Sequence, residues 1–296
     1  MSENFIPLLA TTDWNEEWKE LQKARRNADD AGYWDGRATT FGRKDAPSSY
    51  ADAFIERAGI KPFESVLDMG CGTGALSVPL GMRNHKVIAA DFSPGMLAVL
   101  QKSLDEHKLS CVTTKLMSWE DDWRAHGLSD GSVDVALASR SIATSDLKRS
   151  LMLLDSVAKR RVCITVTPGS SPRLDERIMK GIGLAPLPGY DFQYAFNILV
   201  NEGIKPEVSY IESVRKESYD SVEEAFQDYS PMVYDTAKGI GETERAQALE
   251  RLRSWLEAHL VENLAVAGCD KGGFAPKKFS LDRPRITTWA FIAWDK

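Results

Sequence analysis

Three glycines at alternate positions follow a short apolar stretch in the segment Val66-Leu-Asp-Met-Gly-Cys-Gly-Thr-Gly-Ala75. Glycine permits a sharp backbone turn and the close approach of a ligand that a Cβ atom would block. We expect a strand before Gly70 and a helix directly after Gly74, whose unpaired N–H groups favour an anionic group. In open α/β sheets, ligands bind at this place, beyond the carboxyl ends of the strands. The segment therefore predicts a ligand site.

A carboxylate follows at a spacing that suits the same ligand. Asp91 ends the next apolar stretch, 19 positions after Gly72. It can accept hydrogen bonds from both hydroxyls of a ribose, and charge-assisted bonds of this kind contribute about 1.5–3 kcal/mol each. The glycine turn and this carboxylate together indicate a cofactor that contains a nucleoside, rather than a glycine-rich turn beside an unrelated surface aspartate.

The identity of the cofactor depends on the residues around the turn. Gly70-x-Gly72-x-x-Ala75 fits the dinucleotide fingerprint, so an NAD(P)-dependent oxidoreductase remains an alternative. Two details favour S-adenosylmethionine. Asp68 stands inside the strand, two residues before Gly70, where the dinucleotide motif normally has an apolar residue, and the glycines follow the pattern Gly-x-Gly-x-Gly.

At these residues the sequence resembles the class I S-adenosylmethionine-dependent methyltransferase family. The segment from Val66 to Gly74 is similar to the first motif of the family, Ala90-Asp-Phe-Ser-Pro-Gly-Met-Leu97 to its second, and Gly131-Ser-Val-Asp-Val-Ala-Leu-Ala-Ser139 to its fourth-strand motif. The resemblance covers about residues 50–170. It implies a doubly wound, Rossmann-like α/β sheet of seven strands, mostly parallel with an antiparallel last strand, and S-adenosylmethionine as the cofactor.

The resemblance also implies roles for residues of the first two motifs. Asp68, Gly70 and Gly72 lie against the methionine portion, where Asp68 compensates the charge of the amino group. Asp91 holds the ribose. Phe92 and Met96 flank the adenine.

Other implied roles fall outside these two motifs. Ser118 stands where the family often has an acidic residue at the adenine amino group, which makes stacking by Trp119 more attractive, although Trp119 serves equally well as a core residue. Ser139 and Arg140, just past the fourth strand, face the departing methyl group. Tyr33 and Trp34 resemble aromatic segments that fold over the cofactor, with a docking anchor as the alternative. Tyr33 and Arg140 are the candidates for a catalytic role, and no metal site is expected.

The elements that position these residues alternate along the chain, as in a parallel sheet covered on both faces. We expect five strands, 65–68, 86–90, 111–117, 133–138 and 161–166. A helix over 49–58 precedes them, and helices over 94–104 and 147–158 lie between them. Ser93-Pro94 predicts the start of one helix, with Ser93 as the cap.

The remaining segments are expected to build a cap around this core. An amphipathic helix over 13–30 carries Trp14, Trp18 and Leu21 on one face, and 32–47 is a looser stretch. Further on we expect a loop over 170–190, helices over 192–202, from 221 onward and over 242–264, and strands over 208–216 and 286–294. We divide the chain into a helical cap segment, 1–45, and a methyltransferase domain, 46–296, in which 221–280 is a helical insertion that contributes to the cap.

Composition limits the function. The 296 residues carry 37 Lys+Arg against 43 Asp+Glu, a net charge of −6, which argues against a nucleic-acid partner. No apolar run approaches the ~18 residues of a membrane span. The scattered cysteines, Cys71, Cys111, Cys163 and Cys269, fit neither a zinc site nor a disulfide framework, so a cytoplasmic setting is expected.

The segments around the expected site, 33–41, 139–145, 169–194 and 221–265, are aromatic and rich in glycine and proline rather than basic. They favour a small-molecule acceptor that receives a methyl group by in-line displacement. This chemistry needs alignment and no protein nucleophile. A non-catalytic cofactor-binding module on the same fold remains a further alternative. The sequence does not specify the acceptor atom or the oligomeric state.

Overall fold

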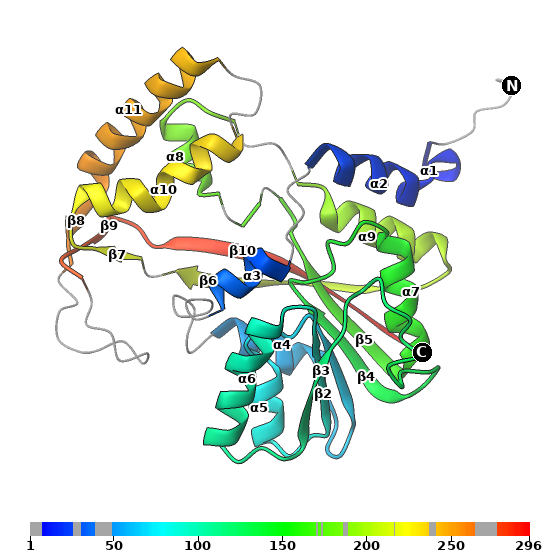
Figure 1. Ribbon diagram of the computed structural model, residues 1–296. Coiled ribbons are helices and arrows are strands. Elements are labelled where there is room, and N and C mark those ends of the chain that lie inside the picture. Colours follow the sequence, from blue (N-terminus) through cyan, green and yellow to red (C-terminus); the bar gives the residue numbers. More distant parts are fainter. Residues whose placement is uncertain are drawn as a thin grey trace, which may run out of the picture.

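Seven strands form one twisted sheet in the described part of the computed structural model (Figure 1). The structure describes residues 8–25, 31–38, 49–169, 171–172, 174–185, 189–215, 217–236, 241–263 and 277–296. The strands are β1 (Val66–Met69), β2 (Val87–Asp91), β3 (Val112–Leu116), β4 (Val133–Ser139), β5 (Ala158–Val166), β6 (Glu207–Arg215) and β10 (Arg285–Asp295).

The strand order is β3-β2-β1-β4-β5-β10-β6. Strands β1 to β5 pair in parallel, whereas β10 is antiparallel to both of its neighbours, β5 and β6. The central strands are continuous apolar runs because both faces of a parallel sheet are covered. The predicted mostly parallel seven-stranded sheet with an antiparallel last strand is confirmed.

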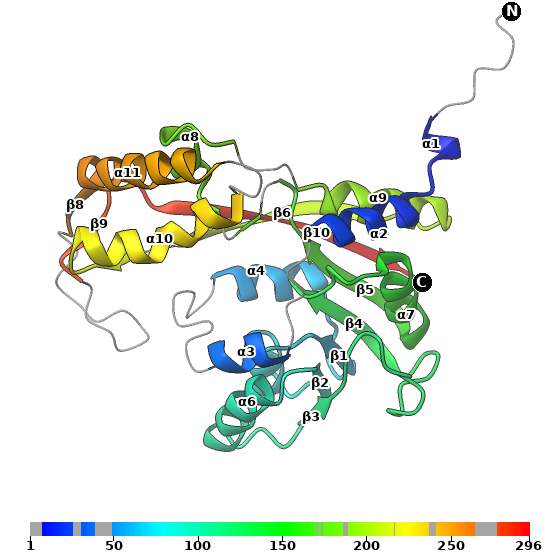
Figure 2. The ribbon, with the colours of Figure 1, turned by 45° about the horizontal axis from the view of Figure 1, so that its top comes forward.

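Helices cover both faces of this sheet, each with its own buried cluster of side chains. One cluster joins the sheet to α2 (Trp14–Arg25), α7 (Leu147–Val157) and α9 (Asp191–Asn201). The other joins it to α4 (Ser49–Ala58), α5 (Ser77–Met82) and α6 (Pro94–Glu106). Figure 2 shows the two groups of helices on opposite sides of the sheet. The arrangement is the doubly wound, Rossmann-like architecture that the alternation of elements predicts.

The N-terminal elements dock on different parts of the sheet layer. Helix α2 follows the short α1 (Leu8–Thr11) and packs against α7 and α9. It ends at Arg25, and residues 26–30 of the expected helix lie outside the described residues. The expectation of a looser stretch from residue 32 is wrong for its first part, because Ala31–Arg37 forms helix α3 on α6. This contact with a distant helix leaves no local signal in the sequence.

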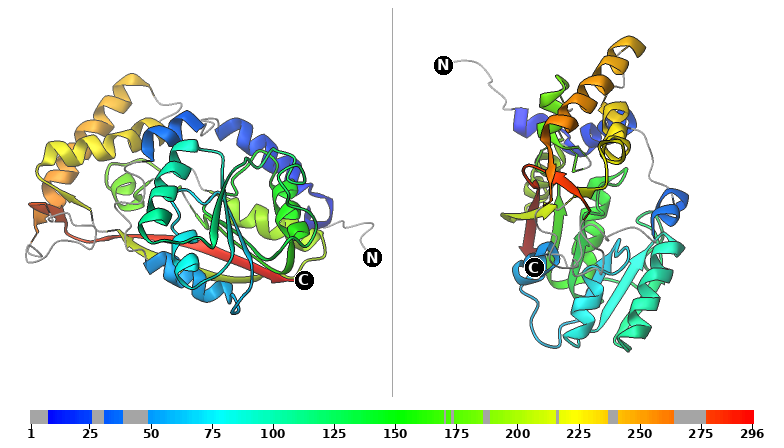
Figure 3. Two further views of the ribbon diagram at one scale, coloured as in Figure 1. Left: turned by 60° about the horizontal axis from the view of Figure 1, so that its bottom comes forward. Right: turned by 90° about the vertical axis from the view of Figure 1, so that its left-hand side faces the viewer.

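A second, smaller sheet of order β7-β9-β8 lies beyond one end of the main sheet (Figure 3). Its strands are β7 (Ser218–Tyr219), β8 (Leu260–Glu262) and β9 (Phe279–Leu281). They share a separate buried cluster with α8 (Glu176–Gly181), α10 (Val222–Thr236) and α11 (Glu242–His259). We call these six elements the outer unit.

The outer unit corrects three expectations. The helix expected over 242–264 ends at His259, because Leu260–Glu262 pairs as a strand with β9. The segment 221–280 is therefore not wholly helical. The stretch expected as a loop over 170–190 contains the helix α8, which the N-cap Asp175 starts by accepting from the backbone N–H of Arg177. Pairing and packing across the chain determine these elements, whereas the local pattern alone favours a continuous helix and a loop.

Candidate cofactor site

The glycine turn between β1 and α5 requires glycine for two reasons. Gly70, Gly72 and Gly74 all have positive φ angles, +72°, +55° and +91°. A Cβ atom on Gly70 would come within 2.3 Å of the Cβ of Ser141, and one on Gly74 within 2.4 Å of a methyl group of Leu100. Gly70 and Gly74 thus let the turn pack against the segment after β4 and against α6. The close approach that these two glycines permit is to other parts of the protein, whereas the sequence analysis expected a close approach to a ligand.

The helix after the turn begins later than expected. Residues 71–76 form successive turns, and α5 starts only at Ser77. The Oγ of Ser77 donates a hydrogen bond to Oδ2 of Asp68 at 2.6 Å. The first residue of the helix therefore fixes the carboxylate of β1 beneath the glycine turn.

Asp68 is a buried acid with 1% of its surface exposed. Burial raises its pKa to about 6, and the negative charge of Asp91 acts in the same direction, whereas the hydrogen bonds from Ser77 oppose the shift. A carboxylate in this environment is costly to ionise without a cation. The site therefore favours a ligand that brings a positive charge.

Asp91 is the second buried acid, at the end of β2. Its Oδ2 accepts from the N–H of Gly72 at 2.8 Å, and its Oδ1 accepts from the N–H of Ser93 at 2.9 Å. Burial raises its pKa, although these backbone bonds act to lower it. Each carboxylate oxygen can accept more than one hydrogen bond, so the group retains capacity for ligand hydroxyls.

The two acids test which cofactor fits. S-adenosylmethionine carries a sulfonium and an ammonium group, and both suit a pair of buried carboxylates. The pyrophosphate of a dinucleotide is anionic and would lie against Asp68. The chemistry of these donors therefore fits the sulfonium cofactor and disfavours the dinucleotide.

Asp35 lies beside this site, although the sequence analysis assigned it no role. Its Oδ1 accepts from the Oγ of Ser93 at 2.6 Å and from the N–H of Gly95 at 2.9 Å, at the start of α6. These two bonds lower the pKa of Asp35. They hold α3 across the second motif, where Trp34 is half-buried and the ring of Tyr33 meets it edge-on at 5.3 Å. The sequence feature that could have indicated this role is an acid directly after two aromatic residues, Tyr33 and Trp34.

The residues assigned to the adenine lie around the ends of β2 and β3. Met96 is buried on α6. Phe92 is half-buried, between the buried residues Asp91 and Ser93. Ser118 is bound to Asp121, which accepts from the Ser118 N–H at 2.8 Å and from its Oγ at 3.1 Å. The acid that position 118 lacks thus stands three residues later.

Trp119 follows Ser118 into the core of the molecule. Its side chain is 8% exposed and belongs to the cluster that also contains Met117 and Trp123. The rings of Trp119 and Trp123 lie 5.6 Å apart. These contacts favour Trp119 as a core residue over Trp119 as a stacking partner of the adenine.

A polar cluster lies at the ends of β4 and β5, on the other side of the glycine turn. The hydroxyl of Tyr50 is within hydrogen-bond distance of Ser139 Oγ, at 2.7 Å, and of Thr165 Oγ1, at 2.6 Å. Thr165 also accepts the N–H of Arg140 at 3.1 Å. Tyr50 and Thr165 were missed by sequence reasoning, because an aromatic residue on the apolar face of α4 gives no sign of what its hydroxyl reaches.

Arg140 has a backbone conformation that is rare outside glycine, with φ +60°. Its guanidinium lies over the ring of Tyr50 at 4.4 Å and over that of Trp289 at 5.8 Å. Such outliers persist only where the surroundings hold them, and they cluster at functional sites. The segment that begins with Ser139 and Arg140 lies next to the β1 turn, since the Oγ of Ser141 donates to the carbonyl oxygen of Met69 at 2.6 Å.

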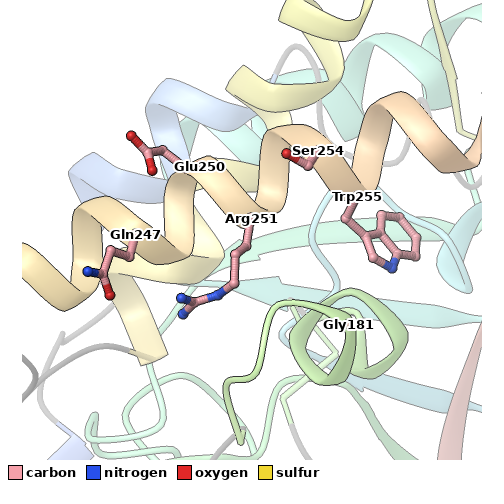
Figure 4. Close-up of a pocket in the computed structure, with 6 residues that line it drawn as sticks. All are labelled: Gly181, Gln247, Glu250, Arg251, Ser254 and Trp255. Carbon is pink, nitrogen blue, oxygen red and sulfur yellow. The ribbon is translucent and has the colours of Figure 1, made fainter.

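A cavity of about 550 Å³ lies in the outer unit, away from the glycine turn (Figure 4). Its lining comes from α8 and α11: Gly181, Gln247, Glu250, Arg251, Ser254 and Trp255. All six residues fall in the segments 169–194 and 221–265 that were expected around the site, but none is a candidate for cofactor binding or catalysis. Arg251 Nε is bound to the carbonyl oxygen of Ile182 at 2.6 Å. We therefore place the candidate site at the carboxyl edge of the main sheet and not in this cavity.

Two general findings apply to the part of the chain that the structure describes. No group of three or more His, Cys, Asp or Glu side chains there is arranged to hold a metal ion. No helix there is both long and apolar enough to cross a membrane. Cys71, Cys111 and Cys163 are free thiols, whereas Cys269 lies outside the described residues.

Comparisons with known sequences find a methyltransferase domain in this chain. A family model described as a methyltransferase domain matches residues 66–160. An uncharacterized protein of Haemophilus influenzae is 32% identical over 182 residues, which cover 61% of this chain and 66% of that protein. The (S)-coclaurine N-methyltransferase of Papaver somniferum is 37% identical over 100 residues, which cover 34% of this chain and 26% of that enzyme. This chain thus spans between about a quarter and about two thirds of these curated relatives.

Among solved structures, the phosphoethanolamine N-methyltransferase 2 of Haemonchus contortus, in complex with phosphomonomethylethanolamine and S-adenosylhomocysteine, has a TM-score of 0.50 with this chain. The two are 15% identical, and the alignment covers 96% of this chain and 60% of that one. At this identity the likeness shows a shared fold. The match to the methyltransferase-domain model runs from β1 through β4 to the first residues of β5, and so includes the glycine turn and the ends of β2 and β4. Residues 66–160 thus match a methyltransferase domain on a fold shared with an S-adenosylhomocysteine-bound methyltransferase, in agreement with the resemblance to the class I S-adenosylmethionine-dependent methyltransferases and with S-adenosylmethionine as the cofactor.

Proposed function

We propose that this protein transfers a methyl group from S-adenosylmethionine to a small-molecule acceptor. The observation that carries the proposal is the pair of buried carboxylates, Asp68 and Asp91, on either side of a turn with three positive-φ glycines. S-adenosylmethionine, when bound, supplies an activated methyl group on a sulfonium. The residues of the chain bind and orient it.

We assign Asp68 to the amino group of the cofactor and Asp91 to its ribose hydroxyls. The basis is the charge of Asp68 and the remaining acceptor capacity of Asp91. Gly70 and Gly72 pass beside the methionine portion, with Met96 and Phe92 toward the adenine. Trp34 closes the site from above, held there by Asp35.

The acceptor side is formed by Ser139, Arg140 and Tyr50. Burial raises the pKa of Tyr50, so its hydroxyl remains protonated at neutral pH and serves as a hydrogen-bonding group rather than a base. Arg140 is the residue that we place against the acceptor. Alignment of acceptor, methyl and sulfur can contribute roughly 7–11 kcal/mol without any covalent intermediate.

We also propose that α2, α3 and the outer unit act as a cap over the site. Asp35 ties α3 to the second motif, and Trp18 of α2 donates through Nε1 to the carbonyl oxygen of Thr144 at 2.8 Å. The outer unit is tied to the start of β10, where Arg285 donates to the carbonyl oxygen of Leu174 at 2.7 Å.

A small-molecule acceptor is supported by the acidity of the chain, with a net charge of −6, and by the small-molecule acceptor in the name of the coclaurine enzyme. The test is incubation with methyl-labelled S-adenosylmethionine and either a metabolite extract or total RNA. We expect label in the small-molecule fraction with the wild-type chain and at least about tenfold less with Asp91→Ala at a low concentration of the labelled cofactor. Label in RNA alone would contradict the choice of acceptor. Cofactor binding without any labelled product would favour a non-catalytic module.

A further inference from the structure

Strand β6 is one edge of the main sheet, and alternate residues along it direct their backbone groups outward. Hydrogen bonds alternate along antiparallel strands. Lys296 donates its N–H to the carbonyl oxygen of Arg160 at 2.8 Å, so the even-numbered residues of β10 bond toward β5 and the odd-numbered ones toward β6. Trp289 is paired with Ile211, and this register continues along both strands. Val208, Tyr210, Glu212 and Val214 therefore present their N–H and C=O groups at the open edge.

A side chain from the neighbouring helix confirms this direction. Arg57 of α4 donates through Nη2 to the carbonyl oxygen of Tyr210 at 3.2 Å, while its Nη1 bonds the carbonyl oxygen of Ala53 within α4. A carbonyl engaged in the ladder with β10 would not turn toward this guanidinium. The Tyr210 carbonyl thus points away from the sheet.

The same edge exposes a strip of large apolar side chains. Val208 is 37% exposed, Tyr210 51% and Val214 53%, and Ile286, which pairs with Val214, is 59% exposed. A nine-residue edge strand with such side chains is a template for pairing with another chain. We therefore expect a partner at this edge to supply both backbone hydrogen bonds and apolar side chains.

The strand Glu207-Val-Ser-Tyr-Ile-Glu-Ser-Val-Arg215 is complementary to itself when reversed. With Ile211 opposite Ile211 of a second copy, Val208 faces Val214, Ser209 faces Ser213 and Tyr210 faces Glu212. At the two ends, Glu207 faces Arg215, so opposite charges meet twice. In this register the four residues with outward backbone groups also meet one another, which is the pairing that an antiparallel ladder needs.

We propose that two copies of this chain pair through β6, antiparallel and around a two-fold axis at Ile211, so that the two main sheets become one. A two-fold interface uses the same surface on both copies, and this strand satisfies that condition by its sequence. Arg57 leaves the carbonyl of Tyr210 in the dimer and keeps its bond to Ala53. The dimer does not depend on the proposed methyl transfer, because the site lies at the carboxyl ends of other strands.

The test is sedimentation equilibrium of the purified chain from 1 to 100 μM, for which we expect a dimer. Val214→Pro removes an outward N–H that the sheet of its own copy does not use, and proline is tolerated at such edge positions. We expect this variant to be a monomer with the circular dichroism spectrum and cofactor affinity of the wild type. Ile286→Ser, on the neighbouring strand, is the matched variant that trims apolar surface and leaves the ladder intact; we expect a weakened dimer.

A charge swap tests the register. Arg215→Glu places two carboxylates opposite each other at both ends of the ladder, and we expect the dimer dissociation constant to rise at least about tenfold. Adding Glu207→Arg restores opposite charges and should return most of the affinity; Arg161, which bonds Glu207, keeps its bond to Asp295 at 2.9 Å. A wild-type monomer at 100 μM overturns the proposal. So does a dimer that persists unchanged in both Val214→Pro and Arg215→Glu.

Discussion

At the scale of single residues, the candidate site is defined by one acid that is costly to ionise. Asp68 is buried, and its pKa is raised to about 6 by burial and by the nearby Asp91. The folded, cofactor-free protein thus holds this proton more tightly than the unfolded chain does. Its contribution to folding stability is greatest at low pH and falls as the pH rises from about 4 to about 6, by about 3 kcal/mol.

Cofactor binding should show the opposite pH dependence. We expect the affinity for S-adenosylmethionine to be highest near pH 7 and to weaken about tenfold per pH unit well below pH 6, because only the ionised Asp68 pairs with the ammonium group. Isothermal titration calorimetry from pH 5 to 8 measures this. Asp68→Asn should bind more weakly and without this dependence. The same slope in both proteins would show that another group titrates.

Asp91 offers a second test at the same scale. We expect Asp91→Ala to weaken cofactor binding at least about tenfold, because two charge-assisted hydrogen bonds to the ribose are lost. Calorimetry at pH 7.5 measures the affinity, and thermal unfolding checks that the chain remains folded without the bonds from Gly72 and Ser93. Asp130→Ala, an exposed acid in the turn before β4, is the control that should bind normally. Equal affinity in both variants would remove Asp91 from the site.

At the scale of elements, helix α2 holds the segment that follows β4. Trp18 is fully buried and donates its indole N–H to Thr144. Asn15 donates to Asp146 at 3.0 Å and accepts from the N–H of Lys148 at 2.9 Å, at the start of α7. The segment that begins with Ser139 and Arg140 is thereby fixed at its far end by residues more than 120 positions earlier in the chain.

Trp18→Phe should reveal this link. The change keeps a large ring but leaves the Thr144 carbonyl without its donor, so we expect a loss of about 1–3 kcal/mol in the free energy of unfolding. Trp123→Phe is the matched control, because Trp123 is also buried but its Nε1 has no hydrogen-bond partner among the described residues. Its loss should be smaller. Urea unfolding of both variants measures the difference, and a larger loss in Trp123→Phe would contradict the role of this hydrogen bond.

The elements also show how much of the fold can be predicted from the sequence. Strands β1, β2 and β4 are predictable because burial on both faces makes them nearly continuous apolar runs. Ser93-Pro94 is predictable as a helix start, and Ser93 accepts the N–H of Met96. Helix α3 and strands β7 to β9 are not, because partners far along the chain determine them. In the site, Asp68 and Asp91 are found from the spacing of the motif. Tyr50, Thr165 and Asp35 are recognised only once the fold brings them to it.

At the scale of the whole molecule, the outer unit has a core separate from that of the main sheet. Its buried side chains include Leu252 and Leu256 of α11, Ala225 of α10 and Ile178 of α8. No member of this cluster belongs to the two clusters that cover the sheet. We therefore expect the outer unit to lose structure without disturbing the glycine turn.

Leu252→Ala tests this independence. Truncating a fully buried leucine costs about 2–5 kcal/mol, and we expect that loss to fall on α10 and α11 alone. Hydrogen exchange should show faster exchange in these helices and unchanged protection in β1, β2 and β4. Leu137→Ala, in the centre of β4, is the comparison that should weaken the whole sheet. Equal loss of protection everywhere in Leu252→Ala would mean that the molecule unfolds as one unit.

Because β10 lies between β5 and β6, the ribosome makes β6 before the strand that joins it to the main sheet. Strand β6 is complete at Arg215, yet β10, its neighbour in the main sheet, starts at Arg285, after α10 and α11. At about 5–20 residues per second, a ribosome leaves β6 waiting for several seconds with both flanks bare. During that interval a self-complementary strand is open to other nascent copies on either side. The pace of translation across the outer unit therefore sets how long this strand stays exposed to other copies.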